Sequence, residues 1–475
     1  MDFPIFHLDI IGDRLLVAVI AITHVLINHS LAVGFFPIVT LLEFRGYKAK
    51  MAGLPESEQW DSLAYKLMYF AFIITTTVGA LTGVGIWFSA ALVSPASIAS
   101  LIRVFFSAWF VEWIVFISEV GAIMIYFLTW KRSNSSIEAK KRHIRFGLAL
   151  SILSWITMAI IVGILGFMMD TGSWVEKKSL LTGFTNPMYI PQMLFRTPMA
   201  FVMAGSVAFF LTLYHLRTPS EFRTKVLKNI AGWMFIWTPH VLASGIIYYY
   251  KVPEMMKLNL SVAVGTQVFQ NWYDTLLYSL GATIVVSMLF TLWVSFKPKR
   301  IPLIFAALPV IVTFFTLGTF ERIREFIRKP FVIGNYMYSN QLRMDEYELF
   351  QKEGILKYAT YVDTPEITEE NKLRAGRNVF NIACSRCHTS NGVNSVVNKF
   401  IALSPAQSSP LEKQQLLTYI PVMHKARYFM PPFPGNAKEL DALAEYILFL
   451  QQDGNSHPGA QAVGVNISPL HSIHK

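Results

Sequence analysis

The chain has 475 residues, of which 53% are apolar and only 15% are charged, and it contains 37 Phe and 11 Trp. This composition excludes an ordinary soluble protein and indicates a polytopic membrane protein. The net charge of +11 is not concentrated in a basic tract interleaved with aromatic residues, so a nucleic-acid partner is not expected.

Eight apolar stretches are long enough to cross a bilayer as helices. They lie at about 12–42, 64–93, 104–130, 146–169, 193–216, 229–250, 272–296 and 301–320. The expected fold class is therefore all-α, with a polytopic membrane helix bundle of about eight transmembrane helices. We expect no cleavable signal peptide, because the first stretch lacks a basic leading region and is too long.

Lys and Arg residues are distributed unevenly between the segments that join these stretches. The segments placed inside by an outer N-terminus are 43–66, 131–145, 217–228 and 297–300. They hold 17 Lys and Arg residues, whereas the outer segments hold 6. The positive-inside rule therefore favours an outer N-terminus. An even number of spans then places the rest of the chain outside as well, on the periplasmic side of a bacterial inner (cytoplasmic) membrane.

Three of the histidines within the predicted spans, His24, His29 and His240, lie away from the span ends. Ionisable residues in a bilayer cost ~2.5–3.5 kcal/mol each on insertion scales, so each is a functional candidate. His24 lies ten residues after Arg14, about 15 Å along the helix, a depth that suits a haem iron. A hydrogen-bonded core histidine is the alternative. His29 is turned about 140° from His24, so both cannot bind one iron. For His240, haem ligand, proton relay and structural bond all stay open.

Two carboxylates, Glu112 and Glu119, lie seven residues apart in the third span and therefore on one helix face. Buried carboxylates can pass protons near neutral pH. We expect these two to deliver protons to a catalytic centre, and interhelical hydrogen bonds are the alternative.

The outer end of the eighth span carries two acidic and basic pairs, Glu321 with Arg324 and Glu325 with Arg328. Each pair is one helical turn apart, which is typical of a salt-bridged helix end. Alternatively, one carboxylate binds an iron while an arginine holds a haem propionate.

Residues 331–365 form a polar connector, and residues 454–475 form a Gly-, Pro-, Ser- and His-rich tail that we expect to be flexible. His471 and His474 in this tail are better explained as part of a frayed end than as a metal site.

The run Cys384-Ser385-Arg386-Cys387-His388 contains the only two cysteines of the chain. In a Cys-x-x-Cys-His run, two thiols bind the vinyl groups of one haem and the histidine binds its iron, which indicates a covalent haem c. A structural zinc site would need further Cys or His ligands.

The sixth ligand of that iron is expected downstream, in a stretch stiffened by prolines. Met430 precedes Pro431 and Pro432, which lack backbone donors, so it is the predicted axial ligand. Met423 is the competing candidate. Helices are expected at 372–380 and 439–450. Residues 366–453 resemble a class I cytochrome c domain.

The first 330 residues resemble subunit I of cytochrome bd oxidase. In that family a first-helix histidine that follows an arginine by ten residues binds a high-spin haem, as Arg14 and His24 would. Residues 78–83 resemble a Gly-rich run of its second helix. Glu112 and Glu119 resemble its two third-helix glutamates, one residue closer together. Its Glu-x-x-Arg-Gln-Pro-Trp run, whose glutamate binds the other high-spin haem, is similar to residues 325–331. The resemblance thus implies that Glu325 binds iron, with Arg328 beside it.

The departures from that family are informative. Its low-spin haem b uses a histidine and a methionine that align best with Arg196 and Leu277, so the resemblance implies that this haem is missing. The loop that binds quinol is reduced to residues 251–271, and the c domain replaces the ninth helix. Quinol is therefore expected to be a poor donor.

Together these features predict a bd-like terminal oxidase subunit. Electrons would come from a periplasmic cytochrome c through the haem c of His388 and Met430. O2 would be reduced at two noncovalent high-spin haems, of type b and/or d, bound by His24 and Glu325. Other membrane subunits, including one similar to bd subunit II, are expected partners. The alternatives are an electron-transfer or scaffold subunit without O2 chemistry, and reduction of another small oxidant such as nitric oxide.

Overall fold

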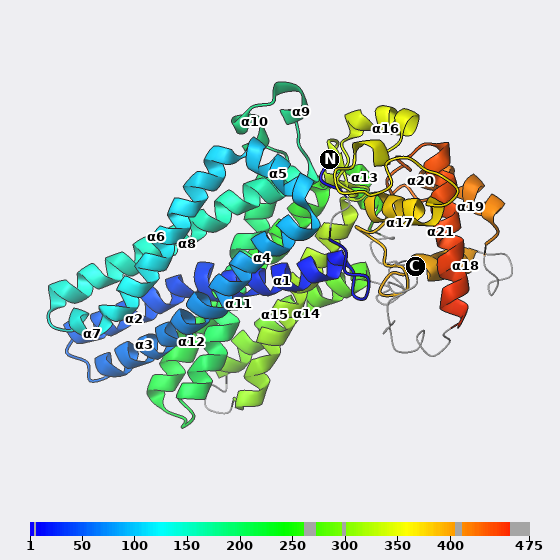
Figure 1. Cartoon of the computed structure of the whole chain (residues 1–475). Coiled ribbons are helices and arrows are strands. Elements are labelled where there is room, and N and C mark those ends of the chain that lie inside the picture. Colours follow the sequence, from blue (N-terminus) through cyan, green and yellow to red (C-terminus); the bar gives the residue numbers. More distant parts are fainter. Residues whose placement is uncertain (4–5, 261–271, 297–300, 404–410, 457–475) are drawn as a thin grey trace.

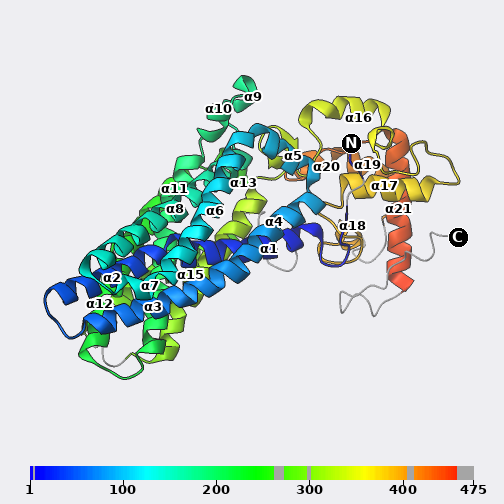
Figure 2. The same cartoon turned by 60° about the vertical axis from the view of Figure 1, so that its left-hand side comes forward.

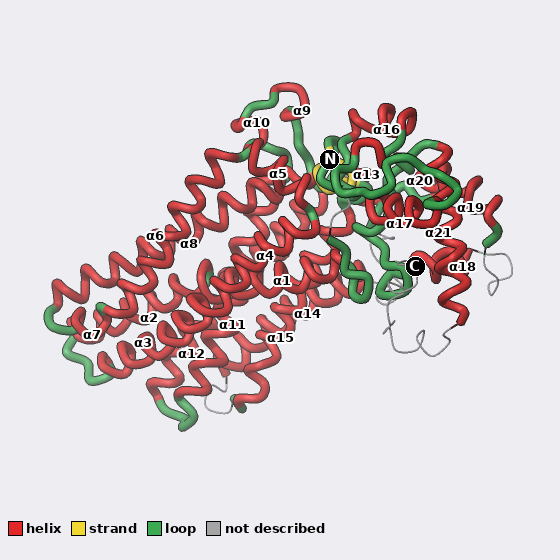
Figure 3. The backbone as a smooth tube through the Cα atoms, in the orientation of Figure 1, coloured by secondary structure: helices red, strands yellow, loops and turns green. Residues whose placement is uncertain are grey.

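The computed structural model describes the chain apart from residues 4–5, 261–271, 297–300, 404–410 and 457–475. Nearly all of its regular structure is helical (Figure 3). The strands of the described residues form one antiparallel pair, β1 (Phe331–Ile333) and β2 (Met337–Tyr338). In the described part of the chain, eight helices are long and apolar enough to cross a membrane. The predicted all-α class and number of spans are confirmed, while His471 and His474 lie outside the described residues.

The membrane domain is an elongated bundle (Figure 1). Its first two spans are each interrupted by a π-helical turn. Their segments are α1 (Asp13–Ile27), η1 (Asn28–Val33) and α2 (Phe35–Met51), then α3 (Ser57–Ile74), η2 (Thr75–Gly79) and α4 (Ala80–Val93). The other spans are α6 (Phe106–Leu128), α8 (Ile137–Met169), α11 (Tyr189–His215), α12 (Glu221–Lys251), α14 (Trp272–Phe296) and α15 (Leu303–Ile327). Short helices join them, namely α5 (Pro95–Val104), α7 (Trp130–Ser133), α9 (Trp174–Lys177), α10 (Leu180–Phe184) and α13 (Glu254–Leu258).

Several helices extend beyond the predicted spans at the end of the bundle remote from the C-terminal domain, which we call the inner end. α2 continues to Met51 and α8 begins at Ile137. Charged residues end an apolar stretch without ending a helix, because Lys, Arg and Glu are good helix formers. Glu43 and His143, which fall outside the predicted spans, are therefore buried in the bundle.

The π-helical turn η1 lies where the first span packs against α11. A Cβ atom on Gly34 would lie 2.2 Å from the carbonyl oxygen of Ala200. Only glycine allows the two backbones to approach this closely. This contact fixes α1 and α2 against the helix that carries Arg196.

The C-terminal domain contains the helices around the Cys-x-x-Cys-His run. It also contains short helices from residues 331–365, which the sequence predicted to be a connector. Its elements after β2 are η4 (Met344–Glu346), α16 (Tyr347–Glu353), η5 (Leu356–Tyr358), α17 (Lys372–Ala383), α18 (Val396–Leu403), α19 (Lys413–Tyr419), η6 (Ile420–Val422), α20 (Met423–Ala426) and α21 (Ala437–Ser456). Residues 331–365 are folded: Phe350 and Ile355 belong to the same apolar core as Phe380 and Leu443. Glu439 fixes them further by accepting hydrogen bonds from the amides of Ile355 (2.9 Å) and Leu356 (2.8 Å).

The N-terminal segment and the C-terminal domain lie at the same end of the bundle (Figures 1 and 2), as an even number of spans requires. Phe3 is buried in the core of the C-terminal domain, and its carbonyl accepts a hydrogen bond from Tyr361 (2.8 Å). Ile10 accepts another from Val393 (3.0 Å). The residues that lead into α1 therefore hold the C-terminal domain against the bundle.

Candidate haem sites

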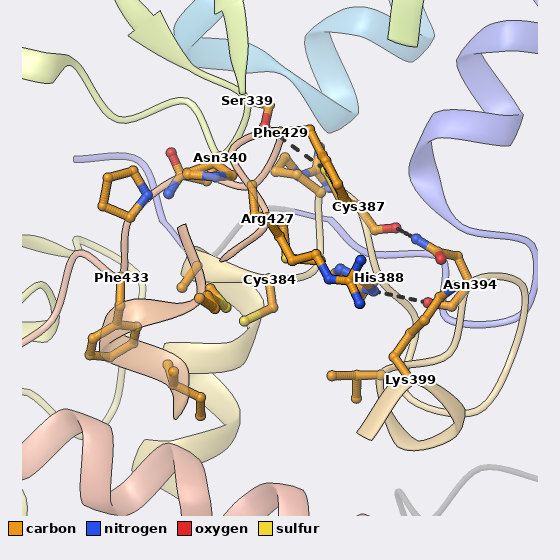
Figure 4. A pocket seen from close by; sticks show the side chains of 18 of the residues that line it. Ser339, Asn340, Cys384, Cys387, His388, Asn394, Lys399, Arg427, Phe429 and Phe433 are labelled. Atoms are coloured by element: carbon orange, nitrogen blue, oxygen red, sulfur yellow. Dashed lines mark hydrogen bonds between the residues drawn. The ribbon is translucent and has the colours of Figure 1, made fainter. Parts of the chain in front are cut away.

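The Cys-x-x-Cys-His run forms a compact turn at the end of α17. The amide of Cys384 still bonds to Phe380 of the helix (2.8 Å), whereas those of Cys387 and His388 both donate to the carbonyl of Cys384 (3.0 Å each). This turn places both cysteines and the histidine around one cavity (Figure 4), as covalent attachment of one haem requires.

His388 is oriented by a backbone carbonyl. Its Nδ1 lies 3.1 Å from the carbonyl oxygen of Asn394, whose side-chain amide donates to the carbonyl of Cys387 (2.6 Å). This bond leaves Nε2 as the nitrogen for an iron. Burial lowers the pKa of His388 to about 4, so the imidazole is neutral, which is the form that binds metal.

The cavity has a volume of about 390 Å³ and contains both candidate methionines in its lining. Met430 is fixed through its backbone: its amide donates to Arg427 (2.8 Å) and its carbonyl accepts from His424 (2.5 Å). Met423 begins α20 and also lines the cavity. The residues fit a haem c, and Met430 stays the predicted axial ligand.

The Cys387 side of the cavity faces the membrane domain. Arg14 and Lys329 line it there, and the thiol of Cys387 lies 4.0 Å from the hydroxyl of Ser339. Burial disfavours the thiolate of Cys387, but Lys329 and Arg14 outweigh it and bring the thiol pKa below its ordinary value. For Cys384, burial raises the pKa to about 12. The second cysteine therefore marks the edge of the haem site nearest the bundle.

Buried contacts hold the attachment turn on the bundle. Arg386, between the two cysteines, forms an ion pair with Asp13, and both side chains are less than 5% exposed. Asp9 accepts a hydrogen bond from the amide of Ser390 (2.6 Å). On the other side of the cavity, Phe429 packs against Phe326 of α15 with ring centroids 6.0 Å apart. The haem site is thus enclosed by two domains.

His24 lies in the membrane domain against the Gly-rich run of the second span. Its Nδ1 is 3.1 Å from the carbonyl oxygen of Gly79, the last residue of η2, and 3.2 Å from the hydroxyl of Thr82. A Cβ atom on Gly83 would lie 3.1 Å from its ring. As in His388, the bond at Nδ1 leaves Nε2 for an iron. π-helical turns are frequent at functional sites, and no sequence pattern predicted this one.

Glu325 and Arg328 form an ion pair at the outer end of α15, and Lys329 lies 3.6 Å from the same carboxylate. The Glu325 side chain is 28% exposed, so it is open to a ligand on one side. Nearby, two nitrogen atoms of the Arg14 guanidinium, Nε and Nη2, are buried without a hydrogen-bond partner among the described residues. Buried guanidinium groups need an acceptor, and a haem propionate supplies one.

Comparisons with known proteins agree with a division of the chain into a membrane bundle and a C-terminal cytochrome c domain. The family model of cbb3-type cytochrome c oxidase subunit III matches residues 371–447. The solved structure of bd oxidase from Geobacillus thermodenitrificans superposes with a TM-score of 0.54 at 15% identity, over 68% of this chain and 89% of that one. No curated protein matches. The chain joins a bd oxidase fold to a cytochrome c domain.

Within the bd-like domain, both predicted proton carriers lie on α6. Glu119 is buried, and its carboxylate accepts a hydrogen bond from Thr157 of α8 (2.7 Å). Glu112 lies two turns closer to the outer end and is half-buried. This geometry agrees with proton transfer by the two carboxylates and also with the alternative, in which they form interhelical hydrogen bonds.

Arg196, the position where the sequence resemblance led us to expect no haem ligand, belongs to a buried charge cluster. Arg196 pairs with Glu321 (2.5 Å), which also binds Arg324 (3.0 Å). His29 lies 3.4 Å from Arg196. The sequence predicted the Glu321–Arg324 pair from helical spacing, but nothing local pointed to the contacts with Arg196 and His29.

Two further positions lie apart from these sites. Leu277 of α14 is 48% exposed. His240 is on the exposed face of α12, with its Nδ1 2.8 Å from the carbonyl oxygen of Ile236 on the same helix. Of the three roles left open for His240, its contacts favour the structural bond.

Proposed function

We propose that this protein is the haem-bearing subunit of a bd-like terminal oxidase. It takes electrons from an external cytochrome c through its own haem c and reduces O2 at a pair of high-spin haems held by His24 and Glu325. One observation carries the proposal: Arg14 and Phe326, which line the cavity of the cytochrome c domain, belong to the helices that carry His24 and Glu325.

Charge at the outer end of the bundle supports two membrane haems. Six basic side chains lie near this end, namely Arg14, Arg196, Arg322, Arg324, Arg328 and Lys329. Two acidic side chains, Glu321 and Glu325, lie among them. This local excess of basic side chains would suit anionic haem propionates. The Arg196–Glu321 pair already occupies the position of a low-spin haem ligand, which supports the absence of that haem.

Bound haem iron would supply electron storage and the chemistry of O2 reduction. The chain supplies the rest. Nε2 of His24 and the carboxylate of Glu325 would hold the two irons, and the Arg328 and Lys329 side chains orient Glu325. Glu119 and Glu112 would carry protons towards the outer end of the bundle.

The surroundings of the protein follow from the same proposal. The cytochrome c domain lies on the periplasmic side of a bacterial inner membrane, where a donor cytochrome c would dock beside Lys399 and Arg427 at the rim of the cavity. The face of α6 that is not packed against other helices exposes Phe110 (54%) and Trp113 (56%). Lipid or another membrane subunit, such as one similar to bd subunit II, would cover it.

Haem analysis of the purified protein tests the proposal. We expect one covalent haem c and two noncovalent haems per chain, with a high-spin signal in the dithionite-reduced spectrum. O2 uptake should follow addition of reduced cytochrome c. One covalent haem and no other would overturn the proposal and favour an electron-transfer or scaffold subunit. Two noncovalent haems with turnover of nitric oxide but not O2 would assign the other acceptor.

A further inference from the structure

Lys329 lies between the cavity of the cytochrome c domain and the carboxylate of Glu325. It is 8% exposed, and its side chain lines the cavity on the side of Cys387. Its Nζ lies 3.6 Å from a carboxylate oxygen of Glu325, which is longer than an ordinary hydrogen bond. The ammonium group therefore belongs to both sites at once.

The backbone of Lys329 is fixed by the bundle. Its amide donates to the carbonyl of Phe326 (3.0 Å), and its carbonyl accepts from the side-chain amide of Asn259 (2.6 Å). The same amide of Asn259 donates to the carbonyl of Ile327 (2.8 Å). The position of Lys329 at the end of α15 is therefore set by the membrane domain.

The related bd motif carries a different residue at this position. In the Glu-x-x-Arg-Gln-Pro-Trp run that residues 325–331 resemble, a glutamine stands in the place of Lys329. Burying an ammonium group costs more than burying an amide, so packing of the bundle does not explain the lysine. A cation beside an iron centre favours the reduced state, which carries less positive charge. The lysine thus suits a bundle that faces a second redox centre.

The residues next to two of the proposed iron ligands contact each other. Phe429 precedes Met430 in the cytochrome c domain, and Phe326 follows Glu325 in α15. The two rings pack with centroids 6.0 Å apart. The guanidinium group of Arg14 lies 5.6 Å from the centroid of the same Phe326 ring. The haem c site therefore meets the bundle at the segment that carries Glu325.

His24 lies farther from this contact. It follows Arg14 by ten residues of α1, which is about 15 Å along the helix axis. Its Nδ1 faces Gly79 and Thr82 of the second span. Electron transfer between haems slows steeply with distance, so an iron at Glu325 is the better acceptor of electrons from the haem c.

We propose that Lys329 joins the haem c site to the Glu325 site, and that electrons pass from the haem c to the iron at Glu325 before they reach the iron at His24. The inference rests on the proposed function, which assigns irons to these residues. In this step one electron leaves the ferrous iron of the haem c, which becomes ferric, and reduces the ferric iron at Glu325 to the ferrous state. No bond forms or breaks, and O2 is the final oxidant. Cys387, on the bundle side of the cavity, marks the edge of the haem c from which the electron leaves.

Lys329→Gln in the complete protein tests the shared residue. It introduces the glutamine of the related motif, whereas Lys329→Arg keeps the charge. Loss of the cation stabilises the ferric form of both irons, so Lys329→Gln should lower the reduction potentials of the haem c and of the haem at Glu325. Lys329→Arg should leave both close to those of the unmodified protein. Redox titration followed by optical spectra measures the two potentials.

Lys399→Gln is the matched control, because Lys399 lines the same cavity near His388. It should lower the potential of the haem c alone. Unchanged potentials in Lys329→Gln, or a lower potential of the haem c only, would overturn the proposal. Equal shifts in Lys329→Arg would also overturn it, because the charge would then not be their cause.

A kinetic measurement tests the order of the two membrane sites. In the absence of O2, a light flash on a ruthenium photoreductant delivers one electron to the haem c, and absorbance follows its oxidation. We expect a fast phase of haem c oxidation in the unmodified protein and in His24→Ala, and loss of this phase in Glu325→Gln. The absorption bands missing from each variant identify the haem that it has lost. Any other pattern would overturn the proposal.

Because the flash measurement needs no O2, it separates this inference from the proposed function. Two noncovalent haems with the expected fast phase but no O2 uptake would refute the proposed O2 reduction and retain the order of electron transfer. O2 uptake with a fast phase that depends on His24 and not on Glu325 would do the reverse. A protein without noncovalent haems would overturn both.

Discussion

The two histidines proposed to bind iron are oriented in the same way, although they belong to different domains. In each, Nδ1 faces a backbone carbonyl, that of Asn394 for His388 and that of Gly79 for His24. Such a bond sets the tautomer and the plane of the ring and raises the basicity of the other nitrogen. The proposed second ligand of the iron at His388 would come instead from a side chain in a proline-rich loop.

Met430→Ala tests that position. Loss of a thioether ligand should lower the reduction potential of the haem c and stop turnover with a cytochrome donor, while the membrane haems stay reducible by dithionite. Redox titration and optical spectra of the purified variant measure both effects. Met423→Ala is the control in the same cavity. A changed haem c in Met423→Ala beside an unchanged one in Met430→Ala would reverse the assignment.

Glu325→Gln distinguishes an iron ligand from a salt-bridged helix end. If Glu325 serves only as the partner of Arg328, it contacts no haem, and its replacement should leave haem content intact. As a ligand, its replacement by a neutral amide should remove or alter one noncovalent haem. Arg328→Ala should weaken the same haem, and His24→Ala the other. Haem stoichiometry and the high-spin signal in electron paramagnetic resonance measure the outcome.

Glu353→Gln is the matched control for this comparison, because Glu353 forms an ordinary i,i+4 pair with Lys357 at an exposed helix end. Normal haem occupancy and an unaltered high-spin signal in Glu325→Gln would favour the alternative function, a scaffold subunit without O2 chemistry.

At the scale of helices, the sites depend on two π-helical turns and on close packing at glycine. η2 ends at the carbonyl that orients His24, and η1 begins four residues after that histidine. Composition and span length predicted the eight helices, because the bilayer imposes both. They did not predict the π-helical turns, since one additional residue in a turn leaves the apolar pattern unchanged.

Gly34→Ala tests the helix contact at η1. The added methyl group would overlap the backbone of Ala200, which cannot move like a flexible side chain, so we expect a destabilisation of about 1–3 kcal/mol or more. Gly121→Ala in α6 is the control, because no other helix in the described part of the chain comes within 4 Å of the place that its methyl group would take. This control should raise stability by about 0.5–1 kcal/mol. Thermal unfolding of the purified protein measures both, and equal shifts would contradict the packing argument.

The boundaries of the predicted spans explain why the buried charged residues at the inner end of the bundle were not expected from the sequence. Glu43, Asp61 and His143 follow or precede apolar stretches, so hydropathy assigned them to loops. The helices continue through them, and three elements distant in sequence then bury their side chains together. Glu112 and Glu119 were identified because each lies inside an apolar stretch. Ionisable residues at span ends need tertiary contacts to be recognised as buried.

For the whole molecule, the central feature is a cytochrome c domain fixed on the bundle. The sequence identified that domain through a short motif. The contacts of the domain with residues 1–3 and 6–13 leave no local pattern in the sequence. Asp13 and Arg386 are 373 positions apart, and only the folded chain brings them together. A fixed domain keeps its haem site at a constant position relative to α1 and α15.

Asp13→Asn and Arg386→Gln should loosen this attachment. Removing one member of a buried ion pair leaves the other uncompensated, at a cost of about 3–5 kcal/mol. We expect faster proteolytic release of the cytochrome c domain and slower electron transfer from it, with the haem c spectrum unchanged. Arg374→Gln is the control, because Arg374 pairs with Asp363 on the surface of the same domain (3.3 Å). Release rates equal to those of the control would contradict fixed docking.

The contact between the N-terminal segment and the attachment turn imposes an order on biogenesis. Phe6 and Asp13 are synthesised long before the attachment turn, yet in the folded chain they contact Arg386, which lies between the two cysteines of that turn. The enzymes that form the thioether bonds need that turn uncovered. If the haem c is attached as proposed, its ligation would precede docking, and the N-terminal segment would pack against the attachment turn only afterwards. Closure of the N-terminal segment would then be the final step of maturation, and chains without haem c would remain open and accessible to proteases.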